Sequence, residues 1–168
     1  MNSPPLFAPW RMPYLKSLGR EDGCFLCDAA TATTAEKKRE LLVLWTTDHT
    51  IVMLNRFPYA NGHLLIAPRA HKSDLEELND AEQLDLSVQT TASIRLLKRA
   101  VSAQGFNIGI NLGKAAGAGL PGHVHQHVVP RWGGDTNFMS VIGEIRIVPQ
   151  ALSQMYDELV RVADEMKR

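Results

Sequence analysis

Three histidines alternate along one short segment of the chain, in the run His123-Val124-His125-Gln126-His127. In a β-strand, side chains two residues apart point to the same face and lie about 6 to 7 Å from one another. If this segment is a strand, the three imidazoles form a row on one face. Ionisable side chains gathered in one place indicate a functional site.

Two chemistries use such a row. Neutral imidazole is a good ligand for zinc or copper. Imidazole is also nucleophilic near neutral pH, because its ordinary pKa of about 6.5 leaves much of it unprotonated. The segment 113–119, Gly-Lys-Ala-Ala-Gly-Ala-Gly, comes shortly before the histidines, and a glycine-rich backbone lets amides approach a phosphoryl group closely. This combination favours covalent catalysis on a phosphorylated substrate.

A second candidate site is the pair Cys24 and Cys27, the only cysteines of the chain. Their Cys-x-x-Cys spacing is that of half a tetrahedral zinc site. Two buried thiols are the alternative that this spacing leaves open. A thioredoxin-like redox pair is less favoured, because no strand–helix–strand pattern surrounds the cysteines.

Size and composition describe an ordinary globular domain. The chain has 168 residues, of which 45% are hydrophobic and 21% charged, and its formal net charge is zero. We therefore expect one domain, and no broad electrostatic attraction to a nucleic acid polymer or an anionic membrane. The proline-rich start lacks the apolar core of a signal peptide, and no apolar run is long enough to span a bilayer, so the sequence predicts a cytoplasmic location.

The elements that must position these residues follow from hydrophobic periodicity and turn signals. An extended strap is expected over about 1–21, and a surface segment over 28–39. A long amphipathic helix is expected over 73–102 and a C-terminal helix over about 150–167. Strands are expected over 41–46, 50–54, 63–67, 106–112 and 123–131, with a weaker strand signal over 144–148. The sequence thus predicts an α+β domain with an antiparallel sheet of about five strands packed with helices.

At this point the sequence resembles the histidine triad (HIT) family of nucleotide hydrolases and transferases. The family signature is His-x-His-x-His followed by two apolar residues, which segment 123–129 matches. The resemblance extends over most of the chain, through Leu54-Asn55-Arg56, segment 61–68 and Asn111. Segments 8–12 and 130–135 resemble the longer bacterial branch that contains diadenosine tetraphosphate phosphorylases and hydrolases. Gln126 departs from the pattern, which usually has an apolar residue there, and it should affect packing or a subunit contact.

The resemblance implies a HIT-like fold and a role for each residue of the site. His125 would attack the α-phosphorus of a nucleoside phosphate and form a covalent nucleotidyl-histidine, and a backbone carbonyl on its other ring nitrogen would fix the reactive tautomer. His127 and His63 would lie against the phosphate oxygens and the leaving group. Asn55 would bind the ribose hydroxyls, with an ordinary turn asparagine as the alternative. The expected phosphate-binding residues are His127, Asn111, Gly117 and Gly119.

The resemblance also implies a structural zinc, because some members carry one. Its ligands would be Cys24, Cys27, His71 and His123. His123 would then be committed to the metal, which would brace the fold and would not activate water. No organic cofactor is expected, and His49 fits no role.

Several alternatives stay open at this stage. The chain could be a non-catalytic nucleotide-binding module, or a metalloprotein that uses all three triad histidines as ligands. Water as the acceptor gives a hydrolase and inorganic phosphate gives a phosphorylase, and the residues do not distinguish them. A small-molecule nucleotide is the expected partner, and the resemblance implies a homodimer formed through the sheet edge and the long helix.

Overall fold

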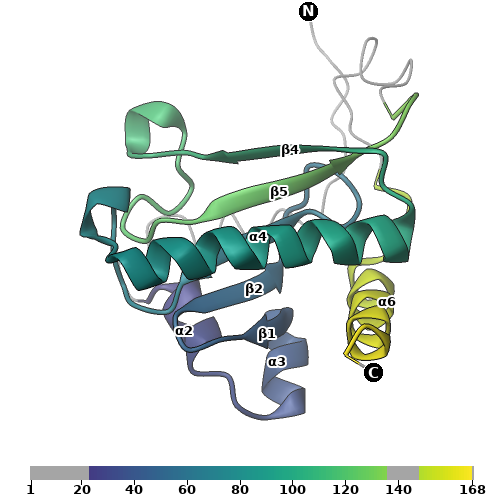
Figure 1. Ribbon diagram of the computed structural model, residues 1–168, viewed down its shortest axis with the longest axis horizontal. Helices are drawn as coiled ribbons and strands as arrows, with labels where there is room; N and C mark the ends of the chain where they lie inside the picture. The colour runs from purple at the N-terminus through teal and green to yellow at the C-terminus, as the bar shows by residue number, and fades with distance from the viewer. Residues whose placement is uncertain (1–22, 136–147, 168) are drawn as a thin grey trace, which may run out of the picture.

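Short runs of β-branched and aliphatic residues form a five-stranded sheet, and helices pack on both of its faces (Figure 1). The computed structural model describes residues 23–135 and 148–167. All neighbouring strands are antiparallel, in the order β1-β2-β3-β5-β4. Their bounds are Val43–Thr46 (β1), Thr50–Leu54 (β2), Leu64–Pro68 (β3), Gly105–Ile110 (β4) and Gln126–Arg131 (β5). This confirms the predicted α+β class with an antiparallel sheet.

The long helix α4, Asp80–Val101, lies across one face of the sheet (Figure 1). It begins at a capping box in which Asn79 and Glu82 satisfy each other's backbone amides, which fixes where the helix starts. It ends at Ser102, whose φ of 50° places it in the left-handed region. The expected helix over 73–102 therefore begins later, because residues before the cap form a short 3-10 turn, η1, Leu75–Glu77.

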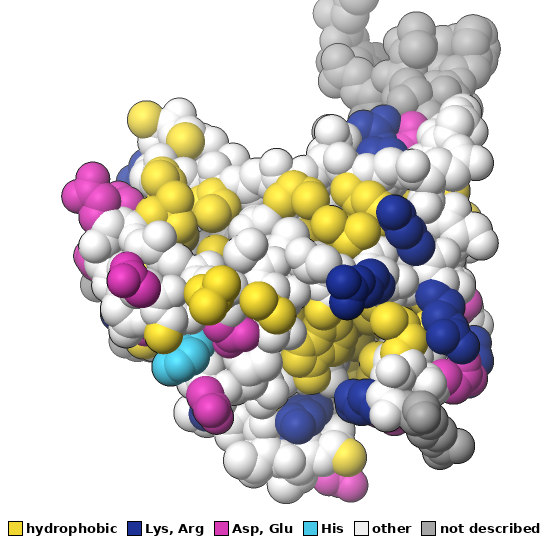
Figure 2. All heavy atoms as spheres, in the orientation of Figure 1, with side chains coloured by type: hydrophobic (Ala, Val, Ile, Leu, Met, Phe, Trp, Pro, Cys, Tyr) yellow, Lys and Arg dark blue, Asp and Glu magenta, His cyan; other side chains and the backbone are white. Residues whose placement is uncertain are grey.

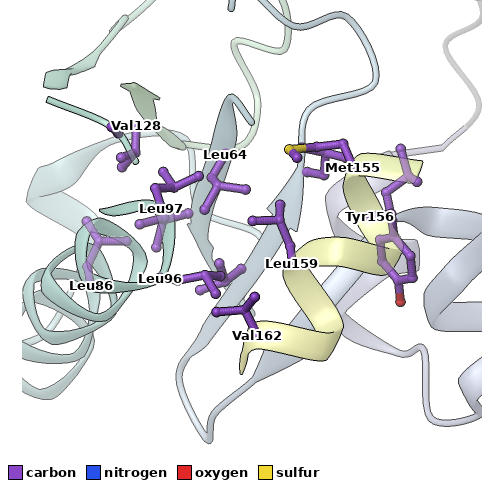
Figure 3. Packing of buried hydrophobic residues seen from close by; sticks show 14 residues of the cluster. Leu64, Leu86, Leu96, Leu97, Val128, Met155, Tyr156, Leu159 and Val162 are labelled. Carbon is purple, nitrogen blue, oxygen red and sulfur yellow. The ribbon is translucent and has the colours of Figure 1, made fainter. Parts of the chain in front are cut away.

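The main core lies between this face of the sheet, α4 and the C-terminal helix α6, Leu152–Glu165. Figure 3 shows side chains from both helices pointing toward those of the sheet. Tyr156 of α6 also donates a hydrogen bond from its hydroxyl to the carbonyl oxygen of Val43, at 2.9 Å. The predicted C-terminal helix is confirmed within these bounds.

The opposite face carries a smaller core beneath the short helix α2, Phe25–Ala30. Leu26 and Ala29 of α2 are fully buried against it. The segment 28–39, expected at the surface, is largely exposed, and it contains the end of α2 and most of a second short helix, α3, Ala35–Leu41. Thr34 caps α3 by accepting a hydrogen bond from the amide of Lys37, a signal that the sequence carried.

One correction bears directly on the histidines. The strand expected over 123–131 begins only at Gln126, so His123 and His125 lie before it. The cause is a long-range backbone contact, because the amide of Val124 donates to the carbonyl of Lys72, at 2.7 Å, and not to a neighbouring strand. The three imidazoles therefore do not form the predicted row on one strand face.

Two expected elements, the strap over 1–21 and the strand over 144–148, lie outside the described residues. In the part of the chain that the structure describes, none of the helices has the length and hydropathy needed to cross a membrane.

Candidate active site

The site lies on the face of the sheet opposite α4. His127 is on β5, and its cross-strand partners are Leu65 on β3 and Gly109 on β4. Residues directly opposite each other in an antiparallel pair point to the same face, and Leu65 belongs to the smaller core beneath α2. A Cβ atom added to Gly109 would meet nothing within 4 Å. The missing side chain on β4 therefore leaves open space beside His127.

His125 is held in one tautomer by the backbone. Its Nδ1 lies 2.8 Å from the carbonyl oxygen of His123, and the side chain is almost fully buried. A carbonyl oxygen can only accept a hydrogen bond, so Nδ1 must carry the hydrogen. Nε2 then keeps its lone pair, and His125 presents a nucleophilic nitrogen.

His63, immediately before β3, is held by different groups in the opposite tautomer. Its Nδ1 lies 3.1 Å from the amide nitrogen of Tyr59 and 3.2 Å from Nδ2 of Asn55. The Asn55 side chain is oriented by the amide of Phe57, which donates to its Oδ1 at 2.9 Å. Both groups that face His63 Nδ1 are therefore donors, so Nδ1 accepts and the hydrogen of His63 lies on Nε2.

This hydrogen sets the state of His127. Nε2 of His63 lies 3.0 Å from Nδ1 of His127, and since His63 donates, His127 accepts. The hydrogen of a neutral His127 is therefore on Nε2. His125 and His127 consequently differ in what their Nε2 atoms present. Nε2 of His125 carries a lone pair, whereas Nε2 of His127 carries a hydrogen.

Burial keeps the rings of His63 and His127 neutral. The side chain of His63 is fully buried, and burial lowers its pKa to about 3, with the nearby His127 and His125 as smaller causes. Burial, followed by the proximity of His125, lowers the pKa of His127 to about 4. Because both ring nitrogens of His63 are engaged within the protein and the side chain has no exposed surface, its expected contact with phosphate oxygens is not supported by the geometry.

A separate group of four side chains converges beside α2. The ligand atoms of Cys24, Cys27, His71 and His123 all lie within 4.8 Å of one another. His123 Nδ1 is 3.2 Å from the sulfur of Cys24 and 3.6 Å from that of Cys27, and His71 Nδ1 is 3.2 Å from the sulfur of Cys27. These residues are close enough to bind a metal, as the sequence predicted.

His123 links the metal-binding group to His125. Its Nε2 lies 2.9 Å from the carbonyl oxygen of Pro68, so this nitrogen carries the hydrogen and Nδ1 offers a lone pair to the sulfur side. Its own carbonyl accepts the hydrogen bond from His125. The three triad histidines thus face three different partners and do not converge on one ion, which disfavours a metal site made of all three.

Apart from His127, the expected phosphate-binding residues lie outside these contacts. Asn111, Gly117 and Gly119 are on the loop between β4 and β5, which contains the short 3-10 helix η2, Lys114–Ala116. Gly117 takes a φ of 81° and its amide donates to the carbonyl of Lys114, at 3.0 Å. In this loop conformation that amide is engaged, and a phosphate would have to displace its partner.

Two features of the site were not predicted. Tyr59, in a segment read only as a turn, lies against His63 and His127. Glu82 pairs with Lys72 at 2.6 Å, and the Lys72 carbonyl holds the amide between His123 and His125. The motif Asn79-x-x-Glu82 signalled the helix cap, whereas no sequence signal indicated the contact with Lys72.

The chain is similar to known proteins over most of its length. The model of the HIT domain matches residues 36–134. A protein of Mycobacterium tuberculosis named AP-4-A phosphorylase is 39% identical over 151 residues, covering 88% of this chain and 77% of that protein.

Two solved structures are similar in fold. A zinc-bound histidine triad family protein from Mycobacterium smegmatis has a TM-score of 0.67 and 24% identity, covering 86% of this chain and 96% of that one. The NitFhit protein of C. elegans has a TM-score of 0.59 and 29% identity over 73% of this chain, which spans only 26% of NitFhit.

Proposed function

The chain belongs to the HIT family, and we propose that it is an enzyme that cleaves dinucleoside polyphosphates such as diadenosine tetraphosphate, or related adenine nucleotides. The observation that carries this proposal is the hydrogen bond from His125 Nδ1 to the carbonyl of His123. It leaves a lone pair on Nε2 of a buried imidazole, next to a ring that presents a hydrogen. A nucleophile and a hydrogen-bond donor side by side are what phosphoryl transfer requires.

In the first step, His125 Nε2 attacks the α-phosphorus. A P–N bond forms as the P–O bond to the remaining polyphosphate breaks, and the polyphosphate leaves with the bonding electrons. In the second step an acceptor attacks the same phosphorus and the P–N bond breaks. Water as the acceptor releases a nucleoside monophosphate, and inorganic phosphate releases a nucleoside diphosphate.

His127 acts on the leaving-group side in this scheme. Its Nε2–H stabilises negative charge that develops on the oxygen between the α-phosphorus and the departing group. Since its lowered pKa keeps the ring neutral at pH 7, it donates a hydrogen bond and is not a cationic acid. His63 is a positioning residue that fixes the tautomer of His127 through the 3.0 Å hydrogen bond.

The nucleotide-binding roles inferred from the family remain proposals. Asn55 orients His63, and the second hydrogen of its Nδ2 and the second lone pair of its Oδ1 remain for a contact with the ribose hydroxyls. Asn111, Gly117 and Gly119 would hold the phosphates once the loop opens its internal hydrogen bonds.

The metal that best fits Cys24, Cys27, His71 and His123 is zinc. Two thiolates and two imidazoles are a common structural zinc set, and bond lengths of about 2.3 Å to sulfur and 2.0 to 2.1 Å to nitrogen place sulfur and nitrogen about 3.6 Å apart in a tetrahedron. The three sulfur–nitrogen distances of 3.2 to 3.6 Å are near that value. When bound, zinc supplies a fixed cross-link between α2, the segment after β3 and the segment before β5.

The Cys27 thiol would have to lose its proton in order to bind a metal. Burial and the neighbouring Cys24 raise the pKa of the Cys27 thiol to about 11, so the thiol is protonated at neutral pH. A bound dication favours the thiolate and displaces that proton.

A product analysis tests the proposed reaction. The protein is incubated with diadenosine tetraphosphate, with and without inorganic phosphate. AMP and ATP indicate hydrolysis, and ADP and ATP that require phosphate indicate phosphorolysis. His125→Ala should abolish turnover and keep the fold. Full activity of that variant would refute the mechanism, and tight binding without turnover by the unaltered protein would indicate a non-catalytic module.

We also propose that two copies pair through the exposed edge of the sheet. Among the strands of residues 23–135 and 148–167, β4 lies at an edge of the sheet, and an unpaired edge is a template for another strand. Ile108 on β4 and Leu84 and Val88 on α4 are exposed, and Figure 2 shows apolar side chains gathered over this face. Light scattering should report a dimer mass, and Ile108→Arg should shift it toward the monomer.

A further inference from the structure

Tyr59 lies in the turn between β2 and β3 and remains half exposed, at 50% of its surface. Its ring covers two histidines of the proposed active site. The ring centroids of Tyr59 and His63 are 4.8 Å apart with a tilt of 34°, and those of Tyr59 and His127 are 5.8 Å apart and stacked within 20°. Offset and tilted aromatic pairs at these separations attract one another.

The backbone of the same turn holds Tyr59 in place. Its amide donates to His63 Nδ1, at 3.1 Å, and the amide of His63 donates to the carbonyl of Ala60, at 3.2 Å. The turn is therefore closed onto the histidine that its own side chain covers. This gives the ring of Tyr59 a defined position relative to both imidazoles.

The hydrogen bond to His63 restrains the ring of His127 at Nδ1. The ring turns about its Cβ–Cγ bond, and this rotation moves Nδ1 and Nε2 together. A rotation that stretches the hydrogen bond at Nδ1 therefore also swings Nε2, the atom that faces the leaving group in the proposed reaction. Gly109, opposite on β4, has no side chain to oppose such a rotation, and His125 meets the ring only edge-on, at 63°.

We propose that Tyr59 is a positioning residue for the cleavage step, because its stacked ring holds the His127 imidazole so that Nε2–H points at the leaving-group oxygen. The inference rests on the proposed function and adds to it. It assigns to the turn a role in catalysis, which Tyr59 exerts through the ring of His127. The outer part of the ring remains open to solvent, as a cover over the site requires.

A series of leaving groups tests this role. The substrates are aryl esters of AMP that run from phenol, whose ordinary pKa is about 10 like that of the tyrosine side chain, to the more acidic p-nitrophenol. An acidic phenol leaves readily without help, whereas phenol itself needs stabilisation by His127. For Tyr59→Leu, we expect kcat/KM for the phenyl ester to fall about threefold to tenfold, the range that one aromatic contact supports.

For the p-nitrophenyl ester, we expect kcat/KM of the same variant to change by less than about twofold, so the dependence on leaving-group pKa becomes steeper. Tyr59→Phe keeps the ring and should restore the wild-type slope. His127→Gln provides the reference for a lost leaving-group contact, and its slope should be at least as steep as that of Tyr59→Leu.

The outcomes separate a positioning role from a structural one. An equal loss for every ester, or no loss for any, overturns the role of Tyr59. A Tyr59→Phe slope as steep as that of Tyr59→Leu also overturns it, because the stacked ring would then not be the cause. If Tyr59→Leu does not fold, Tyr59→Met is measured in the same way. Absence of cleavage of all esters by the unaltered protein instead refutes the proposed function.

Discussion

Replacing His63 with phenylalanine removes both ring nitrogens from the centre of the hydrogen-bond chain while keeping a planar ring in a fully buried position. His127 Nδ1 then loses the donor that fixes its tautomer, now 3.0 Å away. A typical buried hydrogen bond contributes about 1 kcal/mol, and a buried acceptor left without a donor costs up to about 3 kcal/mol. At about 1.4 kcal/mol for each factor of ten in rate, kcat/KM should fall about fivefold to 150-fold.

The assay is cleavage of diadenosine tetraphosphate, with products separated and kcat/KM taken from initial rates at pH 7. The same substitution also leaves the Tyr59 amide and the Asn55 side-chain amide without their acceptor. The thermal midpoint should therefore fall as well, and rates are compared at a temperature where circular dichroism shows both proteins folded.

His63→Gln is the matched control. A glutamine amide can place an N–H near the position of the histidine Nε2, so this variant should retain more of kcat/KM than His63→Phe at a comparable thermal midpoint. If His63→Phe is folded and cleaves at the wild-type rate, the hydrogen-bond chain does not set the state of His127, and the reasoning fails.

Three further outcomes are expected. Burial lowers the pKa of His63 to about 3 and that of His127 to about 4, whereas both are about 6.5 in an unfolded chain. The contribution of these two histidines to stability is therefore complete above pH 6.5 and decreases as the pH falls toward the folded-state pKa values. The free energy of unfolding, from urea titrations between pH 4 and 7, should thus depend less on pH in His63→Phe than in the wild type, and equal slopes would contradict this. Native mass spectrometry should find one zinc ion per wild-type chain. Cys24→Ser should lower both this zinc content and the thermal midpoint, whereas an unchanged zinc content would exclude this site. Gly62→Ala should destabilise the fold by about 1 to 3 kcal/mol, because Gly62 has a φ of +75° and a Cβ there would lie 3.0 Å from a leucine side chain of α4. Gly105→Ala is the control. The nearest atom to a Cβ at that position is 3.8 Å away, so this change should alter stability by less than about 1 kcal/mol.

The sequence was most informative where chemistry depends on residue type and spacing. The alternating histidines and the Cys-x-x-Cys pair could be identified in this way, whereas His71 was implied by the resemblance to the HIT family. The structure brings the cysteines, His71 and His123 together. The strands of the sheet were also predictable, because short β-branched runs between turn residues leave few alternatives. The cytoplasmic location remains a prediction.

Long-range backbone contacts explain what the sequence analysis missed. The start of β5 at Gln126 depends on a hydrogen bond between Val124 and Lys72, and periodicity carries no information about such a partner. The role of Tyr59 was hidden for a similar reason, since a turn aromatic becomes part of a site only when β3 and β5 place His63 beside His127. Residue types predicted which side chains could act, and the family resemblance implied the backbone carbonyl that fixes the tautomer of His125. The hydrogen bonds that set the tautomers of His63 and His127 were not predicted.

The late start of β5 has a chemical consequence for the triad. In a regular strand the carbonyl of His123 would be free to bond a neighbouring strand, as would its amide. Outside the strand, that carbonyl instead accepts from His125 Nδ1, while the His123 ring lies between the Pro68 carbonyl and the two sulfurs. A metal held by this ring would therefore fix the same residue whose carbonyl sets the nucleophile's tautomer. His123 thus connects the two proposed sites: its ring faces the metal-binding cysteines, and its backbone carbonyl holds the proposed nucleophile, His125.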